Sequence, residues 1–433
     1  MGILREGMIQ GRRRVAVVGG GISGLASAWL IGRDHDVTLF EAASYAGGHT
    51  NTVDVTVDGV THPVDTGFLV FNERTYPNLI ALFAILGVAW HDSEMSFSVS
   101  TRQGRQEWAG TSLDSVFARR GNLCNPRFLG MLADILRFNR NSAAWLTQPA
   151  IAEQSLGQLL DAGGYGVAFR DDYLLPMAAA IWSCPTTDVL SFPALSFLQF
   201  CTNHGLLQLM NRPRWRTVQG GGRTYVQKLL QGIWDVRLRT PVLAVTRSAS
   251  GVRLRTADGE MAFDAVVFAT HAPTTLRILG DDATAQEREI LGAIRYNPNR
   301  AVLHSDPLLL PRRQKVWAAW NYASAEDQSG RQAVCVSYLI NKLQPLPFKR
   351  PVIVTLNPLT EPRPEHTWAE FSYEHPLLDQ AAVAAQQRLP GLQGQQHIWF
   401  AGAWTGYGFH EDGLKSALRI ARDFSPQPVL VEV

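Results

Sequence analysis

Three glycines near the amino terminus constrain the fold more than any other feature of the chain. Gly19, Gly21 and Gly24 have GxGxxG spacing and follow the apolar run Val15 to Val18, which is typical of a buried parallel strand. At such a junction one glycine makes a tight turn, the second lets a pyrophosphate approach the backbone, and the third lets a helix pack closely on the strand. The spacing therefore predicts a nucleotide-binding βαβ unit.

The residues that follow complete this unit. A helix over residues 24–30, with Ser23 beside its start, would point free N–H groups and the positive end of its dipole at phosphates. A second strand over residues 37–40 delivers Glu41, whose carboxylate suits a free ribose 2′-hydroxyl and disfavours NADP. Because strand, helix, strand and acidic residue stand in the required order, a purely structural glycine turn is the weaker interpretation.

The segment after Glu41 distinguishes NAD from FAD. Residues 42–50 read AASYAGGHT. This segment resembles the extension of the flavin-containing amine oxidase and phytoene desaturase superfamily, in which Gly-Gly-Arg follows the acidic residue. Gly47 and Gly48 match, and His49 stands at the place of the arginine. The resemblance implies FAD as the cofactor, with these three residues beside its pyrophosphate or flavin region.

A stretch near the carboxyl end, residues 398–421, reads IWFAGAWTGYGFHEDGLKSALRIA and is similar to the carboxy-terminal flavin motif of the same superfamily. Ala403 stands where many members carry an acidic residue that touches the ribityl chain. A helix N-terminus here would offer N–H donors and a positive dipole end to the negative charge of a reduced flavin. The resemblance implies cofactor contacts from Gly402, Ala403, His410, Glu411, Asp412, Gly413 and Leu414.

The run GFHEDGLKSA narrows the resemblance to a bacterial subgroup described as predicted NAD/FAD-binding proteins. Residues 64–68, 320–322 and 341–344 also look like this subgroup, so the resemblance extends from about Val15 to Ala421. Its members are associated with enzymes that resemble cyclopropane fatty acid synthases. The resemblance thus implies lipid-linked chemistry and, as a partner, a lipid-modifying enzyme of the methyltransferase type.

The predicted fold class is α/β, with a Rossmann-like FAD-binding domain that contains a parallel sheet and a β-meander, and an interleaved α+β substrate domain, as in amine oxidases. The 433 residues are too many for one small core and suggest more than one domain. We assign residues 13–75, 216–295 and 391–425 to the FAD-binding domain. Residues 76–215 and 296–390 form the predicted substrate domain.

Local patterns place further elements. Residues 52–65 alternate around Asp58-Gly59, which indicates a hairpin, and the turn after it would bring Thr66 and Gly67 towards the flavin. Residues 79–90, with Pro77 near the start and Gly87 near the end, predict a helix, and the region from 76 to about 215 looks mostly helical.

Three strands are expected over residues 242–247, 252–256 and 262–269. The superfamily has such a meander beside the adenine, which implies a backbone contact from Val242, although a meander in an unrelated mixed sheet would look the same. The triple glycine at 220–222 lacks GxGxxG spacing and a following acidic residue. It therefore does not predict a second dinucleotide site.

The substrate is less well determined. Residues 191–210 are apolar enough to line a hydrophobic tunnel or touch a membrane surface, but buried helices usually just form core, which is the more frequent case. Together with Trp182, Phe192, Phe197 and Phe200, the segment favours an apolar substrate over a polar amine.

Oxidation by FAD requires hydride transfer from a substrate carbon, and a desaturation also requires a base. His410 is the first candidate, because it stands where many amine oxidases carry an aromatic-cage tyrosine and a histidine titrates near neutral pH. A hydrogen-bonding role in the loop is equally consistent with its position. His271 and Lys342 are further candidates, the latter because a lysine holds a water near the flavin in some superfamily members.

Three functions remain open from the sequence. The first is an FAD-dependent oxidase or desaturase that acts on a lipid or fatty-acyl substrate. The second is a flavin amine oxidase, which should present two aromatic rings beside a polar cleft. The third is a flavin isomerase without net oxidation, or a partner of a lipid-modifying enzyme.

Composition excludes other classes of function. Charged residues make up 18% of the chain and the net charge is +2, so there is no electrostatic footprint for nucleic acid. Cys124, Cys184, Cys201 and Cys335 show no zinc spacing and are expected to be reduced thiols. No apolar signal precedes the arginines at 12–14, and no apolar run is long enough to span a bilayer. These features predict a cytoplasmic protein, with peripheral contact to the inner membrane as an alternative.

Overall fold

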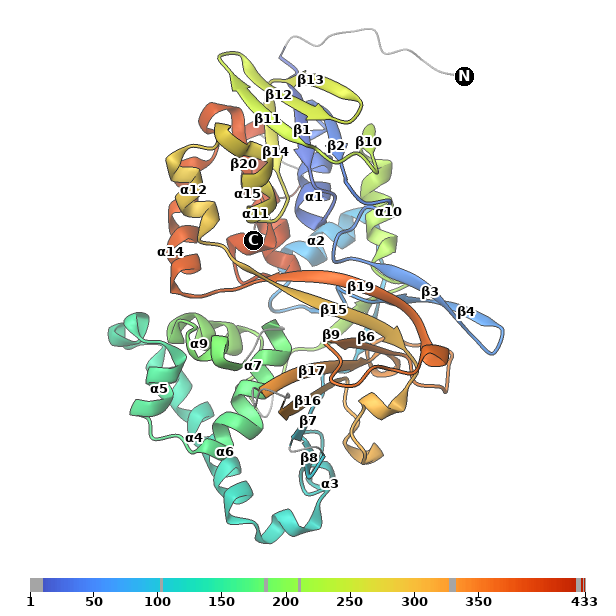
Figure 1. Cartoon of the computed structure of the whole chain (residues 1–433), viewed down its shortest axis with the longest axis vertical. Coiled ribbons are helices and arrows are strands. Elements are labelled where there is room, and N and C mark those ends of the chain that lie inside the picture. The colour runs from blue at the N-terminus through green and yellow to red at the C-terminus, as the bar shows by residue number, and fades with distance from the viewer. Residues whose placement is uncertain are drawn as a thin grey trace.

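The fold is that of a computed structural model, which describes residues 11–101, 104–182, 186–208, 212–326, 332–425, 430 and 432. A parallel five-stranded sheet lies at one end of the molecule and a larger mixed sheet lies towards the other (Figure 1). The parallel sheet has the order β10-β2-β1-β14-β20. Its strands are β1 (Arg14–Val18), β2 (Asp36–Phe40), β10 (Asp235–Arg237), β14 (Ala265–Phe268) and β20 (Ile398–Phe400).

Alternation along β1 explains how this sheet is covered on both faces. Val15 and Val17 pack with α1 (Ile22–Ile31), α2 (Pro77–Leu86), α10 (Arg223–Gln231) and α15 (His410–Phe424). Ala16 and Val18 pack on the other face with the meander and with α11 (Ala272–Leu279), α12 (Ala285–Gly292) and α14 (Gln380–Arg388). The predicted α/β class with a Rossmann-like sheet is therefore confirmed.

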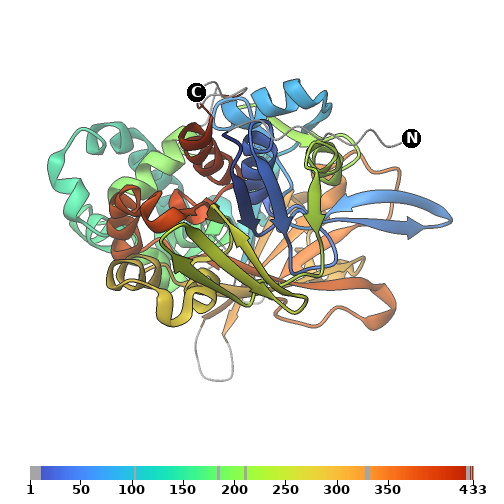
Figure 2. The same ribbon diagram turned by 90° about the horizontal axis from the view of Figure 1, so that it is seen from above.

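The meander consists of β11 (Ala244–Ser248), β12 (Gly251–Thr256) and β13 (Gly259–Phe263), and Figure 2 shows it alongside the parallel sheet. The third predicted strand, 262–269, is wrong, because it spans two strands of different sheets. Asp264 separates them: its N–H donates to the Arg14 carbonyl, and its carboxylate accepts from the Arg14 N–H at 2.6 Å. The chain therefore leaves the meander at Asp264 and enters the parallel sheet as β14.

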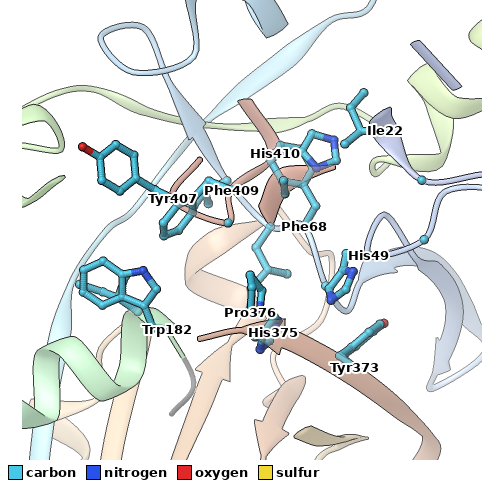
Figure 3. Close-up of a pocket in the computed structure, with 18 of the residues that line it drawn as sticks. Ile22, His49, Phe68, Trp182, Tyr373, His375, Pro376, Tyr407, Phe409 and His410 are labelled. Atoms are coloured by element: carbon cyan, nitrogen blue, oxygen red, sulfur yellow. The ribbon is translucent and has the colours of Figure 1, made fainter. Parts of the chain in front are cut away.

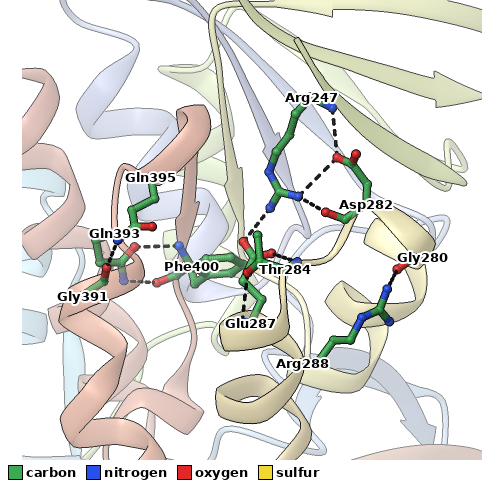
Figure 4. Close-up of polar contacts among 10 residues, drawn as sticks. All are labelled: Arg247, Gly280, Asp282, Thr284, Glu287, Arg288, Gly391, Gln393, Gln395 and Phe400. Atoms are coloured by element: carbon green, nitrogen blue, oxygen red, sulfur yellow. Dashed lines mark hydrogen bonds and ion pairs between the residues drawn. The ribbon is translucent and has the colours of Figure 1, made fainter. Parts of the chain in front are cut away.

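Side-chain hydrogen bonds join the meander and β20 to neighbouring helices and loops (Figure 4). Arg247 joins β11 to Glu287 on α12 at 2.6 Å, and Thr284 and Glu287 form a capping box at the start of that helix. Gln393 donates to the Phe400 carbonyl at 2.8 Å and accepts from its N–H at 2.9 Å. Because β20 is an edge strand, Gln393 closes part of an edge that would otherwise be open to pairing.

The second sheet has seven strands in the order β19-β15-β18-β17-β16-β7-β8. Helices α3 to α9 pack beside it and form a helical region on the side away from the parallel sheet (Figure 1). The strands are β7 (Phe97–Thr101), β8 (Gln106–Ala109), β15 (Tyr296–His304), β16 (Trp320–Glu326), β17 (Gln332–Leu339), β18 (Ile353–Leu356) and β19 (Thr367–Pro376). The helices are α3 (Leu113–Val116), α4 (Pro126–Trp145), α5 (Leu156–Ala162), α6 (Val167–Phe169), α7 (Leu175–Trp182), α8 (Thr186–Leu190) and α9 (Ala194–Asn203), and α13 (Ile340–Leu343) follows β17.

The mostly helical prediction for residues 76–215 misses three strands, because short strands carry little periodicity. Helix α2 ends at Gly87, which has φ +61°, and Trp90 already belongs to β6 (Trp90–Ser93). Strand β6 pairs with β9 (Trp215–Val218), which also pairs with β5 (Phe71–Asn72). The parallel-sheet strands all lie in segments predicted for the FAD-binding domain, and the domain boundaries themselves stay a prediction.

The predicted hairpin is present as β3 (Thr52–Val57) and β4 (Val60–Asp65), and it projects from the side of the molecule in Figure 2. Asp58 and Gly59 both have positive φ, as a tight two-residue turn requires. Cys124 is exposed and Cys201 and Cys335 are buried, all as free thiols, whereas Cys184 lies outside the described residues. Among the residues that the structure describes, no helix is both long and apolar enough to cross a bilayer.

Candidate functional site

A cavity of about 1590 Å³ lies between the parallel sheet and the seven-stranded sheet. At one end it is lined by the glycine loops and at the other by aromatic and apolar side chains of the helical region. In Figure 3, His49, Tyr373 and His375 lie on one side, and Trp182, Tyr407 and Phe409 on the other. The same cavity therefore has a part suited to a nucleotide and a part suited to an apolar molecule.

The three glycines of the first loop serve different purposes. A Cβ on Gly24 would overlap the Gly19 carbonyl oxygen, so the start of α1 and the loop touch through backbone alone. Gly19 has φ +108°, and a Cβ there would lie 2.7 Å from the Ala269 oxygen. A Cβ on Gly21 would meet no atom within 4 Å. Gly21 thus leaves open the space in front of the helix start, where a pyrophosphate can approach the backbone.

Glu41 stands at the end of β2 and lines the cavity. Its Oε2 accepts from the Gly20 N–H at 2.6 Å, and its Oε1 accepts from the Ala43 N–H at 2.7 Å. The Thr240 N–H donates to the Glu41 carbonyl, which places residues 240–242 beside it. Val242 lines the cavity, and its backbone forms no hydrogen bond within the described chain. Glu41 and Val242 are therefore positioned for a ribose and an adenine.

The second glycine pair lies directly against the first loop. The Gly47 N–H donates to the Gly20 carbonyl at 2.7 Å, and a Cβ on Gly48 would lie 3.1 Å from the Gly21 Cα. His49 packs on Tyr373 with a ring-centre distance of 5.1 Å, and its buried Nε2 has no hydrogen-bond partner among the described residues. Burial and the nearby His375 lower the pKa of His49 well below its usual value. His49 is therefore neutral and does not supply the charge of an arginine.

The turn after β4 also reaches the cavity. Thr66 donates to the Asn51 carbonyl at 2.9 Å and lies 2.8 Å from the Tyr373 hydroxyl, while a Cβ on Gly67 would overlap the His49 carbonyl oxygen. Both residues line the cavity as predicted. The role of the preceding Asp65 was not predicted from the sequence. The triple glycine at 220–222, whose Gly222 N–H donates to Asp65, was the available signal.

Asp65 joins the hairpin to α10. Its buried carboxylate accepts from the Gly222 N–H at 2.9 Å, from Thr52 Oγ1 at 2.5 Å and from Gln344 Nε2 at 2.9 Å. Burial raises its pKa to about 6. Asp65 therefore holds the backbone that carries Thr66 and Gly67 into the cavity.

The carboxy-terminal motif contributes fewer residues than predicted. Gly402, Ala403 and His410 line the cavity, but Glu411, Asp412, Gly413 and Leu414 do not. Glu411 accepts from the N–H groups of Asn78 and Leu79 and thereby caps α2. Leu414 is fully buried in the core, and the Gly413 N–H already donates to the Phe409 carbonyl. These four residues do not line the cavity, and the expected contact of their backbone N–H groups with the cofactor stays a prediction.

Asp412 is turned back towards its own loop, where Oδ2 accepts from the N–H groups of Tyr407 and Phe409 at 3.1 and 3.0 Å. Gly413 is needed for packing, because a Cβ there would lie 2.8 Å from Ser23 Oγ and Ile22 on α1. Ser23 itself lines the cavity. The motif therefore acts mainly by setting the loop from 402 to 410.

The three candidate bases lie in different environments. His410 Nε2 is 2.7 Å from the Tyr225 hydroxyl, its ring stacks on Phe68, and burial lowers its pKa to about 3. The Tyr225 hydroxyl is in turn 2.5 Å from Thr50 Oγ1. His410 is thus a neutral member of a buried hydrogen-bonded chain, which does not suit a base that titrates near neutral pH.

Lys342 lies outside the cavity wall, with Nζ 3.0 Å from both carboxylate oxygens of Glu94, so the structure does not place it at the cofactor site. His271 lines the cavity, where Nδ1 is 3.0 Å from Glu374 Oε2 and the ring stacks on Tyr296 at 4.4 Å. A carboxylate partner orients a histidine ring and fixes which ring nitrogen faces the cavity. Of the three candidates, His271 has the geometry of a proton acceptor.

The apolar end of the cavity is built from α7, α9 and the loop before α15. Phe200 stacks on Phe409 with 4.8 Å between ring centres and lies 4.6 Å from Trp182. In helix α9, Phe197 and Leu198 lie in the hydrophobic core, and Phe200 belongs to this core and also lines the cavity. Residues 191–210 therefore contribute both to the hydrophobic core and to the wall of the apolar cavity. Phe192 belongs to the core, and Leu209 and Met210 lie outside the described residues.

Comparisons with known proteins agree with this geometry. A family model for flavin-containing amine oxidoreductases matches residues 22–303. The chain belongs to this family. No curated protein sequence shows significant similarity to the chain.

Solved structures show the same fold over almost the whole length. A putrescine oxidase variant, at 17% identity, has a TM-score of 0.67 over 95% of this chain and 98% of the other. A protein described as a protoporphyrinogen oxidase from Exiguobacterium sp. 255-15, at 18% identity, and a conjugated-linoleic-acid-producing fatty acid isomerase from P. acnes, at 15%, also have TM-scores of 0.67 over 95% of this chain, and these matches cover 98% and 99% of theirs.

As a member of this family the protein is an FAD-dependent oxidoreductase. The residues of the cavity fit the cofactor: the space at Gly21 is open, the Val242 backbone is unbonded within the described chain, and Glu41 is fixed at the adenosine end. The buried Nε2 of His49 adds a polar atom that the described protein residues leave unpartnered. Gly21, Glu41 and Val242 would hold the dinucleotide, and Thr66, Gly67, Gly402 and Ala403 would line its flavin end.

Asp412 gives a pH-dependent prediction. Burial raises its pKa to about 6, above the ordinary value for aspartate, so its carboxyl ionises in the unfolded chain before it does so in the folded protein. This group therefore lowers stability as pH rises from about 4 to 6. We expect the free energy of unfolding of Asp412→Asn, measured in urea, to rise by about 1 to 3 kcal/mol relative to that of the wild type between pH 4 and 6. A constant difference between the two proteins from pH 4 to 6 would contradict this assignment.

Proposed function

We propose that the protein uses FAD to oxidise a lipid or fatty-acyl substrate, as an oxidase or desaturase. One observation carries the proposal: the substrate end of the cavity is apolar, and no unpaired carboxylate is described in its wall. Its wall includes Met95, Met177, Trp182, Phe200, Leu206 and Phe409. Burial of a long hydrocarbon chain in such a cavity is favourable by about 25 cal/mol for each Å² of apolar surface removed from water.

The carboxylates of this wall are already engaged. Asp92, at the exposed rim, forms an ion pair with Arg216, and Glu94 is paired with Lys342. Glu374 is hydrogen-bonded to His271 at 3.0 Å. An alkylammonium ion would need an anion of its own once it left water, because burial of an unpaired charge is costly. The described wall offers none at this end, which disfavours an amine substrate.

Two further histidines of the cavity wall, His204 and His375, are neutral near pH 7. Burial lowers the pKa of His204 and of His375 to about 4, and His204 Nδ1 lies 2.9 Å from the Phe200 carbonyl oxygen. Arg212 and Arg214, which are exposed, line the cavity where it meets solvent. Guanidinium groups at this rim suit the carboxylate or phosphate of an acyl compound whose chain lies inside.

When bound, FAD accepts a hydride from a substrate carbon. In a desaturation the neighbouring carbon loses a proton, which we assign to His271, with Glu374 orienting the ring. The aromatic wall orients the chain and excludes water from the reacting carbons. A fatty acid isomerase is among the solved structures with this fold, which supports a fatty-acyl substrate.

An anaerobic titration of the purified holoenzyme tests the proposal. Phospholipids with unsaturated or methylated acyl chains, and the matching free fatty acids, should bleach the flavin absorbance band, whereas alkylamines should not. Bleaching by amines alone would establish an amine oxidase instead. Conversion of a lipid without bleaching would favour an isomerase, and no response to any lipid would remove the acyl substrate class.

The pairing of Glu94 can be tested directly. Lys342→Met removes the cation from Glu94, whose carboxylate lies in the cavity wall, so alkylamine binding should strengthen by about ten-fold. The matched control is Lys315→Met, which breaks a surface pair with Asp114. Dissociation constants from flavin spectral changes measure both variants. If amine affinity in Lys342→Met equals that of the wild type, the paired carboxylate is not what excludes amines.

A further inference from the structure

We propose that the solvent-facing side of α3 and α4 docks on an anionic lipid bilayer. This docking face consists of Leu113, Leu123, Leu129, Leu136 and Val167, with Arg119, Arg120 and Arg140. Its five apolar side chains are between 40% and 79% exposed. In Figure 1, α3 and α4 form the lower end of the molecule, opposite the parallel sheet.

Helix α4 is apolar on two sides. Phe128, Met131, Ile135 and Phe138 form its buried face. A surface helix of a soluble protein is normally polar on the opposite face. Here the solvent side carries Leu129, Ala133, Leu136 and Ala143, at intervals of four, three and seven residues. The outer face of α4 is therefore an apolar stripe without a described partner in this chain.

Charge indicates which partner fits this stripe. Residues 113–145 contain five arginines and two aspartates, with no lysine or glutamate. Both aspartates are paired within the segment, Asp114 with Arg120 and Asp134 with Arg137. Arg119 and Arg140 form no ion pair with a described carboxylate and remain exposed. Exposed leucines beside excess arginines match the interface of a bilayer that contains acidic phospholipids.

The docking face is continuous with the cavity. Gly110 and Thr111 are exposed and line the cavity, and a Cβ on Gly110 would meet no atom within 4 Å. Leu113, the most exposed leucine of the docking face, follows two residues later. Trp108 and Phe97 continue the cavity wall inward. An acyl chain would enter the cavity from the membrane without crossing water. This entry route rests on the proposed function.

Vesicle flotation with the holoenzyme tests docking. The protein should float with vesicles of phosphatidylglycerol and phosphatidylethanolamine, less with phosphatidylcholine alone, and less at high salt. The triple variant Leu113→Gln, Leu129→Gln, Leu136→Gln should lower the partition coefficient at least about ten-fold. Because these side chains are exposed, its flavin spectrum and thermal unfolding should match those of the wild type.

Two variants serve as matched controls. Leu308→Gln and Val60→Thr replace exposed apolar side chains that lie outside the docking face and should leave vesicle binding unchanged. The charge variant Arg119→Gln, Arg140→Gln should bind more weakly at low salt and converge with wild type at high salt.

Three results would overturn the proposal. The first is no flotation of the wild type with acidic vesicles, and the second is equal flotation of the triple variant. The third is a wild-type dimer, in light scattering, that the triple variant converts to a monomer, because the face would then bind a second copy of the chain. Vesicle binding involves no turnover, so its failure and a failed anaerobic titration are distinguishable.

Discussion

Gly24→Ala should destabilise the apoprotein by about 3 kcal/mol or more and abolish FAD binding. The added Cβ would overlap the Gly19 carbonyl oxygen and lie 3.2 Å from the Ala269 side chain. Both neighbours belong to strand ends of the parallel sheet, so neither can move without breaking it. Urea unfolding of the apoprotein and quenching of FAD fluorescence measure the two effects.

Gly21→Ala is the matched control, because the two glycines lie in the same loop. A Cβ at this position meets no protein atom within 4 Å, and the backbone has an ordinary φ of −72°. Stability should stay within about 0.5 kcal/mol of wild type. FAD affinity should nevertheless fall about 10- to 100-fold, because the methyl group occupies the space needed by the pyrophosphate. Normal FAD binding in both variants would refute the assignment of this loop.

Asp65→Ala should cost about 3 to 5 kcal/mol of stability. It removes the acceptor for the Thr52 hydroxyl of the same hairpin and for the Gly222 N–H and the Gln344 amide of two distant segments. Thr66 and Gly67 follow directly, so FAD affinity should fall in parallel. Urea unfolding and FAD titration test both parts.

The control is Asp54→Ala on the same hairpin. Asp54 binds Arg223 of α10 at 2.7 Å, but both side chains are partly exposed to solvent. A surface pair of this kind contributes about 0 to 1 kcal/mol. If both variants lose the same stability, burial of Asp65 is not what makes it important.

Features that depend on neighbouring residues could be predicted from the sequence. The first βαβ unit, the β3–β4 hairpin and α2 were found because glycine, proline and apolar periodicity act within one short segment. The cavity positions of Gly19, Gly21, Glu41, Gly48 and Val242 follow from the same local patterns and the family resemblance. The strands β6, β7 and β8 were missed, because strands of four or five residues carry little periodicity.

Side-chain partners across the fold could not be predicted. His410 looked like a base until its contact with Tyr225, 185 positions away, and its burial became visible. Lys342 is held by Glu94, 248 positions away, and Glu411 caps a helix 333 positions away.

The sequence by itself therefore determined the nucleotide-binding fold and, through the family resemblance, the cofactor, because backbone conformation depends on nearby residues. Only the tertiary structure decided which histidine is oriented by a carboxylate, which charges are neutralised and where the apolar cavity opens. Those properties depend on burial and on distances between segments, and residue order alone does not specify either.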